Sequence, residues 1–359
     1  MTMSTLIFTN NVSKALDEIV AERKPSQVFV HVDTNTAKFV MPILKVDSDV
    51  IANATIIESP SGDQNKTLES LENVWKKLSE AGATRSGMFI NVGGGVVSDL
   101  GGLAAATFKR GMTVVNIPTT LLAAVDASVG GKTAINFQGV KNQIGVFSDP
   151  DSVIISTIFF ETLTESEMLS GYAEMIKHAM LKDSKTLADI LRYKITLPPT
   201  NPDALLDLLR ENVLIKKEIV EADPTETGLR KVLNLGHTVA HAFEAFAMND
   251  RREAAISHGF AVAQGLVVEA ILSNMIEGFS SDTLHTLASY VKENYGPFMF
   301  TCDDYPKLLE YMRQDKKNTT PDQITFTLLK APGEPVINVT ATDEQIKAAL
   351  DIYRDLMGL

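Results

Sequence analysis

The first half of this 359-residue chain alternates short runs of valine and isoleucine with helical patterns. Such runs are typical of buried parallel strands, and five of them stand at Gln27–Val32, Ala54–Ser59, Gly87–Val92, Met112–Ile117 and Ser152–Ser156. Helical patterns such as Asn65–Gly82 lie between them. Because parallel strands need crossover connections, usually helical, the alternation predicts a parallel sheet with helices on its faces.

From about Phe159 the pattern becomes mostly helical. Helices are predicted at Leu163–Met180, Asp203–Glu221, Leu229–Phe246, Gly259–Ile276 and Thr342–Leu356. A hairpin is predicted over Gln323–Val339, turning at Pro332–Gly333, and Met248–Ser257 is expected to be an exposed loop. The sequence therefore predicts an α/β parallel-sheet domain over residues 1–157 and a mostly α-helical domain over residues 158–359.

Composition limits the partners and the location of the protein. The chain is 45% hydrophobic and 22% charged, which is ordinary for a globular protein, and its single cysteine, Cys302, excludes an internal disulfide framework. It has no apolar run of membrane-spanning length and no signal-peptide pattern at its start, so a cytoplasmic location is expected. A net charge of −12 argues against nucleic acid and membrane as partners but permits a small anionic substrate.

A glycine-rich segment, Asn91–Gly102, follows a predicted strand and opens a helix. Glycines there let backbone amides approach a phosphate, and the helix N-terminus favours its negative charge. The usual dinucleotide pattern would have glycine where this chain has Ser98, so the segment is a variant. Phosphate or dinucleotide binding is favoured over a plain strand-to-helix turn, because five glycines exceed what a turn requires.

A second dense segment, Pro118–Gly145, places polar groups among small residues: Asp126, Lys132, Asn136, Lys141 and Asn142. Lysines flanked by glycines suit contact with a phosphate or a carboxylate. Ordinary surface lysines in a solvated loop are the alternative, and this segment alone leaves both interpretations open.

Two of the six histidines, His237 and His241, stand four residues apart in a predicted helix and so share one face. This spacing suits two ligands of one metal, or one ligand and one catalytic neighbour. Thr238 stands where zinc proteases have glutamate, which argues against a hydrolytic zinc site. Glu174, in an apolar helix, and His258 are candidates to complete a site; a core or surface histidine is the alternative for each one alone.

Cationic and amide side chains accompany the histidines. Arg230 and Asn234 precede His237 and His241 at spacings that place all four on one stripe of the predicted Leu229–Phe246 helix. Lysine pairs at 216–217 and 316–317 are further candidates, although such pairs are most often solvated.

Taken together, these segments resemble the 3-dehydroquinate synthase family of the sugar phosphate cyclase group over nearly the whole chain. The resemblance is carried by four stretches: GGGVVSDLGG; PTTLLAAVDASVGGKTAIN with KNQIG; SGYAEMIKHAM; and GLRKVLNLGHTVAHAFE with SHGFAVAQG. It implies a Rossmann-type N-terminal domain that binds NAD, and a helical C-terminal domain that carries a divalent metal, usually Zn²⁺, with Co²⁺ or another ion possible.

The resemblance also implies individual roles. The metal ligands would be Glu174, His237 and His258, and His241 would be an active-site neighbour that is not a ligand. The cofactor-binding positions would be Asp63, Lys66, Gly95, Val96, Val97, Ser98, Asp99, Thr119, Thr120, Lys132, Lys141 and Thr162. The catalytic and substrate-binding positions would be Arg110, Asp126, Lys132, Asn142, Lys177, Lys216, Arg230, Asn234, His241 and Lys316, with Lys317 the alternative to Lys316. Arg110 would reach the substrate phosphate across the interface of a homodimer.

The implied reaction converts 3-deoxy-D-arabino-heptulosonate 7-phosphate, a sugar-acid phosphate, to 3-dehydroquinate and phosphate in the shikimate pathway. Two departures from the family pattern stand out: Asp63 replaces a glutamate, and Lys109 precedes Arg110 where an apolar residue is common. The alternatives are a sister cyclase acting on a substrate without a carboxylate, a metal-dependent NAD alcohol dehydrogenase, and a non-catalytic NAD-binding protein. The quinate reaction is favoured by retention of Arg230, Asn234, His241 and the lysines Lys316 and Lys317.

Overall fold

The structure is a computed structural model that describes residues 4–138, 140–250, 256–315 and 323–359. The chain divides into two compact units: residues 1–168 with 195–217, and residues 169–194 with 218–359. The first division falls at residue 168, later than the expected boundary at 157/158. The first unit also includes residues 195–217, which were expected to belong to the helical domain. Residues 251–255, half of the predicted Met248–Ser257 loop, lie outside the described residues, and Met248 and Asn249 form the end of a helix.

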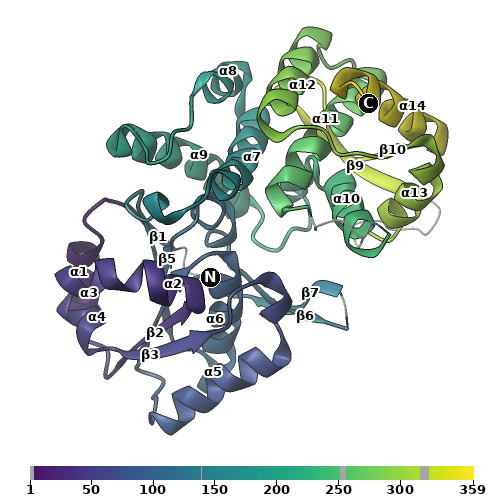
Figure 1. Ribbon diagram of the computed structural model, residues 1–359. Coiled ribbons are helices and arrows are strands. Elements are labelled where there is room, and N and C mark those ends of the chain that lie inside the picture. The colour runs from purple at the N-terminus through teal and green to yellow at the C-terminus, as the bar shows by residue number, and fades with distance from the viewer. Residues whose placement is uncertain (1–3, 139, 251–255, 316–322) are drawn as a thin grey trace. The chain divides into compact units, whose positions relative to one another are not determined.

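The first unit is built on a six-stranded parallel sheet in the order β1-β8-β5-β4-β2-β3 (Figure 1). The five predicted strands are confirmed as β2 (Val28–Asp33), β3 (Thr55–Ser59), β4 (Met88–Gly93), β5 (Thr113–Pro118) and β8 (Ser152–Ile155). The short edge strand β1 (Thr5–Phe8) was not predicted. The carboxyl ends of β4 and β5 lead directly into the glycine-rich and lysine-rich segments.

Helices cover both faces of this sheet, as the alternation predicted. On one face α1 (Val12–Arg23), α3 (Met41–Asp47) and α4 (Asp49–Asn53) pack on strand side chains such as Val30 and Ile90. On the other, α5 (Leu68–Glu80) and α6 (Gly95–Thr107) pack on the alternate residues, Phe29 and Phe89. Short α2 (Thr34–Phe39) follows β2. The sheet therefore has an apolar core on each side.

The lysine-rich segment contains a hairpin that the sequence analysis treated as a loop. Strands β6 (Lys132–Phe137) and β7 (Val140–Phe147) pair antiparallel as a separate two-stranded sheet. β6 packs against α6 through buried residues such as Thr133 and Ile135, whereas β7 is exposed along its length. The abundance of polar and glycine residues hid the strands, and β7 lacks the alternation of a half-buried strand because it is exposed throughout.

The second unit is mainly helical. Its helices include most of α7 (Glu165–Lys182), α8 (Ser184–Arg192), the end of α9 (Pro202–Ala222), α10 (His237–Asn249), α11 (His258–Glu277), α12 (Ser281–Tyr295), α13 (Tyr305–Arg313) and α14 (Asp343–Met357). The predicted hairpin is confirmed as antiparallel β9 (Ile324–Leu329) and β10 (Pro335–Ala341). α11 contacts α10, α12, α14 and β9, so it forms the centre of this unit.

The predicted Leu229–Phe246 helix is wrong in one respect, because the structure interrupts it. Residues Leu229–Asn234 form a separate 3₁₀ helix, η5, and α10 begins only at His237. Gly236 has φ +81°, a left-handed conformation that glycine adopts without steric cost. Arg230 and Asn234 therefore do not share one helical stripe with the histidines.

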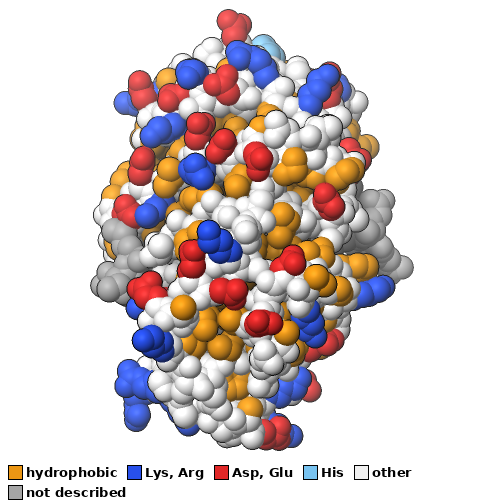
Figure 2. Space-filling view, turned by 90° about the vertical axis from the view of Figure 1, so that its left-hand side faces the viewer, with side chains coloured by type: hydrophobic (Ala, Val, Ile, Leu, Met, Phe, Trp, Pro, Cys, Tyr) orange, Lys and Arg blue, Asp and Glu red, His pale blue; other side chains and the backbone are white. Residues whose placement is uncertain are grey.

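The surface carries charges of both signs. Figure 2 shows Asp and Glu side chains interspersed with Lys and Arg over one face. One helix, α11, is long and apolar enough to cross a membrane, but 78% of its apolar window is buried inside the protein. Its composition is that of a core helix surrounded by other elements.

Candidate functional site

The glycine-rich segment forms the start of α6, as predicted. Gly94 is the N-cap residue, and the helix begins at Gly95. A Cβ on Gly94 would lie 3.2 Å from the Thr120 side chain, and one on Gly95 would lie 3.1 Å from Ala127. Val96, Val97 and Ser98 continue the first turn. The segment therefore presents helix N-terminal amides in a tightly packed loop, which is the arrangement that binds phosphate groups.

Behind this turn, Lys66 bridges two predicted carboxylates. Its Nζ lies 3.0 Å from Asp99 Oδ2 and 3.4 Å from Asp63 Oδ1, and the lysine is only 4% exposed. Burial raises the pKa of Asp99 to about 6, although Lys66 opposes this shift. Lys66 thus links Asp63 to Asp99, which belongs to α6.

The hairpin residues join this network. Lys141 Nζ lies 3.8 Å from Asp63 Oδ2, and Asn136 Nδ2 donates to the Asp63 carbonyl at 2.9 Å. The backbone N–H of Asn142 donates to Asn136 Oδ1 at 2.9 Å. Lys132, at the start of β6, is exposed. The structure therefore brings Lys141 and Asn136 of the hairpin to Asp63.

Asp126 and Lys216 form a second ion pair in the first unit. Lys216 Nζ donates to Asp126 Oδ1 at 2.7 Å and to the Asp126 carbonyl at 2.5 Å, and the lysine is 5% exposed. Lys216 lies in the segment 195–217, which belongs to the first unit, so this ion pair joins two parts of that unit that are 90 residues apart in the sequence.

The remaining predicted residues of the first unit have simpler surroundings. Thr119 donates its backbone N–H to the Gly93 carbonyl at 3.0 Å, and Thr120 Oγ1 accepts from the N–H of Ala123 at 3.1 Å. Thr162 Oγ1 donates to the Phe159 carbonyl at 2.7 Å. Arg110 is exposed and has φ +69°, an uncommon backbone conformation for a non-glycine residue.

In the second unit, three predicted ligands from three helices converge. Glu174 Oε1 lies 3.4 Å from His237 Nε2 and 3.2 Å from His258 Nε2. One donor atom from each residue lies within 4.8 Å of the others. Ligand atoms about 2.0–2.2 Å from a tetrahedral ion stand roughly 3.3–3.6 Å apart, so these separations fit a zinc-like ion.

Both imidazoles are held by their other ring nitrogen. His237 Nδ1 lies 3.0 Å from the Leu235 carbonyl, so it donates and leaves Nε2 as the acceptor. His258 Nδ1 lies 3.4 Å from Glu244 Oε2. A carboxylate or carbonyl behind a histidine fixes the ring for metal binding.

The charges in this cluster affect one another because the groups are buried and close together. Burial opposes charge on Glu174, but Lys177, whose Nζ lies 2.5 Å from Glu174 Oε2, and the histidines hold the pKa of Glu174 well below its usual value. Burial and Lys177 lower the pKa of His237 to about 4. Burial also opposes charge on His258, yet hydrogen bonds to Glu174 and Glu244 raise the pKa of His258 to about 10. The carboxylate is thus ionised and attracts positive charge.

His241 faces a different partner. Its Nδ1 lies 2.9 Å from Asp315 Oδ2, and its ring meets that of His237 edge-on, with centroids 5.6 Å apart. His241 is not a member of the converging carboxylate–imidazole group. The two histidines therefore have different hydrogen-bond partners, and the division of roles between them stays a prediction.

Arg230 and Asn234 lie on the segment before α10. Arg230 is 2% exposed; its Nη1 donates to the Pro224 carbonyl at 2.7 Å, and its N–H donates to Asp223 Oδ2 at 3.0 Å. Asn234 Nδ2 donates to Glu226 Oε1 at 3.0 Å. Lys316 and its alternative Lys317 lie outside the described residues.

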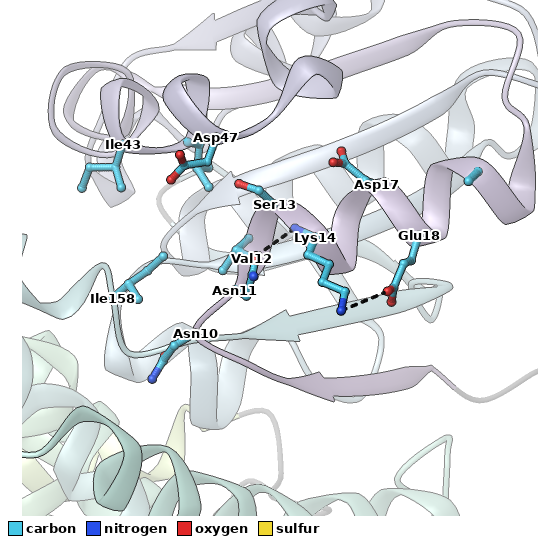
Figure 3. Close-up of a pocket in the computed structure, with 12 residues that line it drawn as sticks. Asn10, Asn11, Val12, Ser13, Lys14, Asp17, Glu18, Ile43, Asp47 and Ile158 are labelled. Carbon is cyan, nitrogen blue, oxygen red and sulfur yellow. Dashed lines mark hydrogen bonds and ion pairs between the residues drawn. The ribbon is translucent and has the colours of Figure 1, made fainter.

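A separate cavity of about 730 Å³ lies in the first unit at the start of α1 (Figure 3). None of the predicted site residues lines it. Asp17, Glu18 and Asp47 contribute carboxylates, and Lys14 lies 4.0 Å from Glu18. An acidic lining of this kind does not suit an anionic substrate.

Several residues that support these sites were missed by the sequence analysis: Glu244, Asp315, Glu269, Asp223 and Glu226. Glu244 had a signal, because it stands three residues after His241 on the same helical face. Glu269 also had one, because an acidic residue in an apolar core helix requires a partner. Asp315 had none, because its contact with His241 joins residues distant in sequence.

Comparisons with known proteins cover the whole chain. A family model described as 3-dehydroquinate synthase N-terminal matches residues 56–170, and one described as 3-dehydroquinate synthase C-terminal matches residues 171–318. A 3-dehydroquinate synthase of Parabacteroides distasonis is 42% identical over 359 residues, which is 100% of both chains.

Solved structures of other cyclases share the fold. A 2-deoxy-scyllo-inosose synthase complexed with carbaglucose-6-phosphate, NAD⁺ and Co²⁺ has a TM-score of 0.83 at 20% identity, covering 96% of this chain and 95% of that one. ValA, the 2-epi-5-epi-valiolone synthase of Streptomyces hygroscopicus subsp. jinggangensis, with NAD⁺ and Zn²⁺ bound, has a TM-score of 0.82 at 21% identity, covering 99% and 98%.

Proposed function

The chain belongs to the 3-dehydroquinate synthase family, and we propose that it converts 3-deoxy-D-arabino-heptulosonate 7-phosphate to 3-dehydroquinate and phosphate. The observation that carries the proposal is the convergence of Glu174 with His237 and His258. The described part of the chain also contains the cationic side chains expected for a substrate that bears a phosphate and a carboxylate: Arg110, Lys132, Lys177, Lys216 and Arg230. The reaction would serve the shikimate pathway in the cytoplasm.

The donor set supports a divalent metal held by Glu174, His237 and His258. One carboxylate oxygen and two imidazole nitrogens are the usual ligands of a catalytic zinc with an open coordination position. The Nδ1 contacts to Leu235 and Glu244 orient both Nε2 atoms toward Glu174. When bound, the ion supplies a Lewis acid that orients and acidifies a ring alcohol.

The start of α6 and the Lys66 network support binding of NAD by the first unit. The amides of Gly95 to Val97 would face the pyrophosphate, and Asp63, Lys141 and Asp99 would contact the remainder with Thr119, Thr120 and Thr162 nearby. When bound, NAD would supply reversible hydride transfer. The net reaction is then redox-neutral.

The chain's own cations and amides would hold the substrate. Arg230, Asn234 and Lys177 would bind its carboxylate and hydroxyl groups, while Lys132, Asn142 and Arg110 would bind the phosphate and stabilise its negative charge as it leaves. Lys216 and Asp126 would position one another through their short ion pair. His241, with Asp315 behind Nδ1, would present Nε2 to the substrate for hydrogen bonding or proton transfer.

We also propose a homodimer. In the described residues, β7 pairs with β6 alone, and its Val140, Ile144 and Val146 side chains are exposed. An apolar edge strand is a liability unless another chain covers it. A second copy of the same strand is self-complementary, so a two-fold dimer would cover both.

The proposal is tested by a paired assay on the seven-carbon phosphate. Released phosphate and the absorbance of reduced nicotinamide are followed together with only enzyme-level NAD. We expect phosphate release over many turnovers with little NADH, and loss of that turnover in Arg230→Ala. One NADH per substrate consumed and no phosphate would indicate an alcohol dehydrogenase, and preference for a substrate without the carboxylate would indicate a sister cyclase.

A further inference from the structure

A fully buried carboxylate lies beneath the first turn of α10. Glu269 belongs to the apolar helix α11 and is 0% exposed. Its Oε2 accepts from the backbone N–H of Gly236 at 2.6 Å. Its Oε1 accepts from the N–H groups of Thr238 at 3.1 Å and Val239 at 3.3 Å. Both oxygens are therefore committed to the backbone on either side of His237.

These three N–H groups belong to a helix end that cannot cap itself. The first N–H groups of an α-helix have no partner within the helix and are usually satisfied by an N-cap side chain. The N-cap residue of α10 is Gly236, and glycine offers no side chain. Glu269 takes over this role from a neighbouring helix, and the positive end of α10 stabilises its negative charge.

The two helices also approach closely at this point. A Cβ on Gly265 would lie 2.0 Å from the Gly236 carbonyl oxygen, and a Cβ on Gly236 would lie 2.8 Å from Leu266 Cδ2. The start of α10 is thus seated directly on the backbone of α11. Its position along α11 is set by this contact together with the Glu269 hydrogen bonds.

We propose that Glu269 is a positioning residue for the metal centre, because it holds His237 in register with His258. The inference rests on the proposed metal site. Helix α11 begins with His258 and also carries Glu269, so one helix supplies one ligand directly and orients the other through the cap. His237 Nδ1 contacts the Leu235 carbonyl in the same turn that Glu269 holds. Loss of the carboxylate frees that turn and the ring with it.

The experiment compares Glu269→Ala and Glu269→Gln with Gln264→Ala in the full chain. Gln264 is a buried polar residue of the same helix, but its partners are the Gly296 carbonyl and Tyr353 Oη. Zn²⁺ affinity is measured by competition with a chelator, the Co²⁺-loaded proteins are compared by visible absorption, and hydrogen exchange is followed at the amides of residues 236, 238 and 239.

We expect Glu269→Ala to weaken Zn²⁺ binding about tenfold or more, as is typical when support behind a ligand is removed. Glu269→Gln, which keeps one acceptor oxygen, should be intermediate, and both should exchange the three amides faster and alter the Co²⁺ spectrum. Gln264→Ala should lower the melting temperature while leaving Zn²⁺ affinity and the spectrum as in the wild type.

Unchanged Zn²⁺ affinity in Glu269→Gln, despite faster amide exchange, would overturn the inference even if Glu269→Ala does not fold. Equal loss of affinity in Gln264→Ala would overturn it too, because general destabilisation would then explain the effect. If the wild type binds no metal, the proposed function fails and this inference fails with it. If the wild type binds Zn²⁺ and the Glu269 variants bind it with the same affinity, the proposed function stands and only this inference fails.

Discussion

His31, at the centre of β2, is a fully buried imidazole whose hydrogen bonds are all satisfied in its neutral form. Its Nδ1 lies 3.2 Å from Asn91 Oδ1, and the Asn91 amide in turn donates to Asn116 Oδ1 at 2.9 Å, which fixes Oδ1 toward His31. Nδ1 therefore donates, and Nε2 accepts from Ser59 Oγ at 3.0 Å. A second proton on the ring would disrupt this chain.

The stability of the protein should depend on pH through His31. Burial lowers the pKa of His31 from 6.5 to about 4, so the unfolded chain binds this proton more readily than the folded one. The free energy of unfolding is therefore unaffected by this group above pH 6.5. It decreases as the pH falls from 6.5 toward 4, by up to about 3 kcal/mol. Thermal unfolding at pH 7.5, 6 and 5 measures the effect.

The control for this prediction is His31→Gln, which removes the titrating group. Asp99, with its raised pKa, has the opposite dependence, so the comparison of the two proteins isolates His31 from other groups. Between pH 7.5 and pH 5, the melting temperature of the wild type should fall further than that of His31→Gln. Parallel losses would show that His31 does not carry the dependence.

The two histidines of α10 should differ when replaced. His237→Ala removes one of three donors and should abolish stoichiometric Zn²⁺ binding together with activity. His241→Ala leaves the donors intact and should keep the metal while activity falls by about 10²-fold or more, since a group for proton transfer is lost. Metal content by atomic emission and far-ultraviolet circular dichroism check both variants. Loss of metal from His241→Ala would reverse the assignment.

At the scale of elements, the start of α6 should decide NAD affinity. A Cβ on Gly95 already meets Ala127 at 3.1 Å, so the branched side chain of Gly95→Val would crowd the turn whose amides face the pyrophosphate. We expect the Kd for NAD to rise at least about tenfold, measured by titration calorimetry. Ala106→Val, near the other end of the same helix, is the control and should bind NAD normally. Equal affinity of all three proteins would refute the placement.

Elements were predictable where one pattern dominated. The buried strands and the apolar helix α11 were recognised because their composition leaves few alternatives. The break at Gly236 was not, because the apolar periodicity continues through it, and its cause lies in another helix: Leu266 and Gly265 leave room only for glycine. The β6–β7 hairpin was missed because β7 is exposed and lacks the alternation of a half-buried strand.

At the scale of the whole molecule, sequence motifs identified the residues but could not give their partners. The candidate ligands Glu174, His237 and His258 were chosen from spacing and resemblance, and the structure brings their donor atoms together. The supporting contacts of Asp315 with His241 and of Glu269 with α10 join residues far apart in the chain. Long-range contacts of this kind depend on the packing of complete elements, which no local pattern encodes.

The proposed dimer makes a prediction about shared sites. Arg110 is exposed, so its guanidinium is accessible to a neighbouring subunit. We therefore expect Arg110→Ala and His237→Ala to be inactive alone but to complement one another when co-expressed. A mixed dimer would contain one site with an intact metal cluster and an intact arginine from the partner. Random pairing should then restore about a quarter of wild-type phosphate release. If Arg110 serves its own subunit, no mixed dimer has an intact site and the mixture stays inactive; light scattering on the same samples would show directly whether the chain is a monomer.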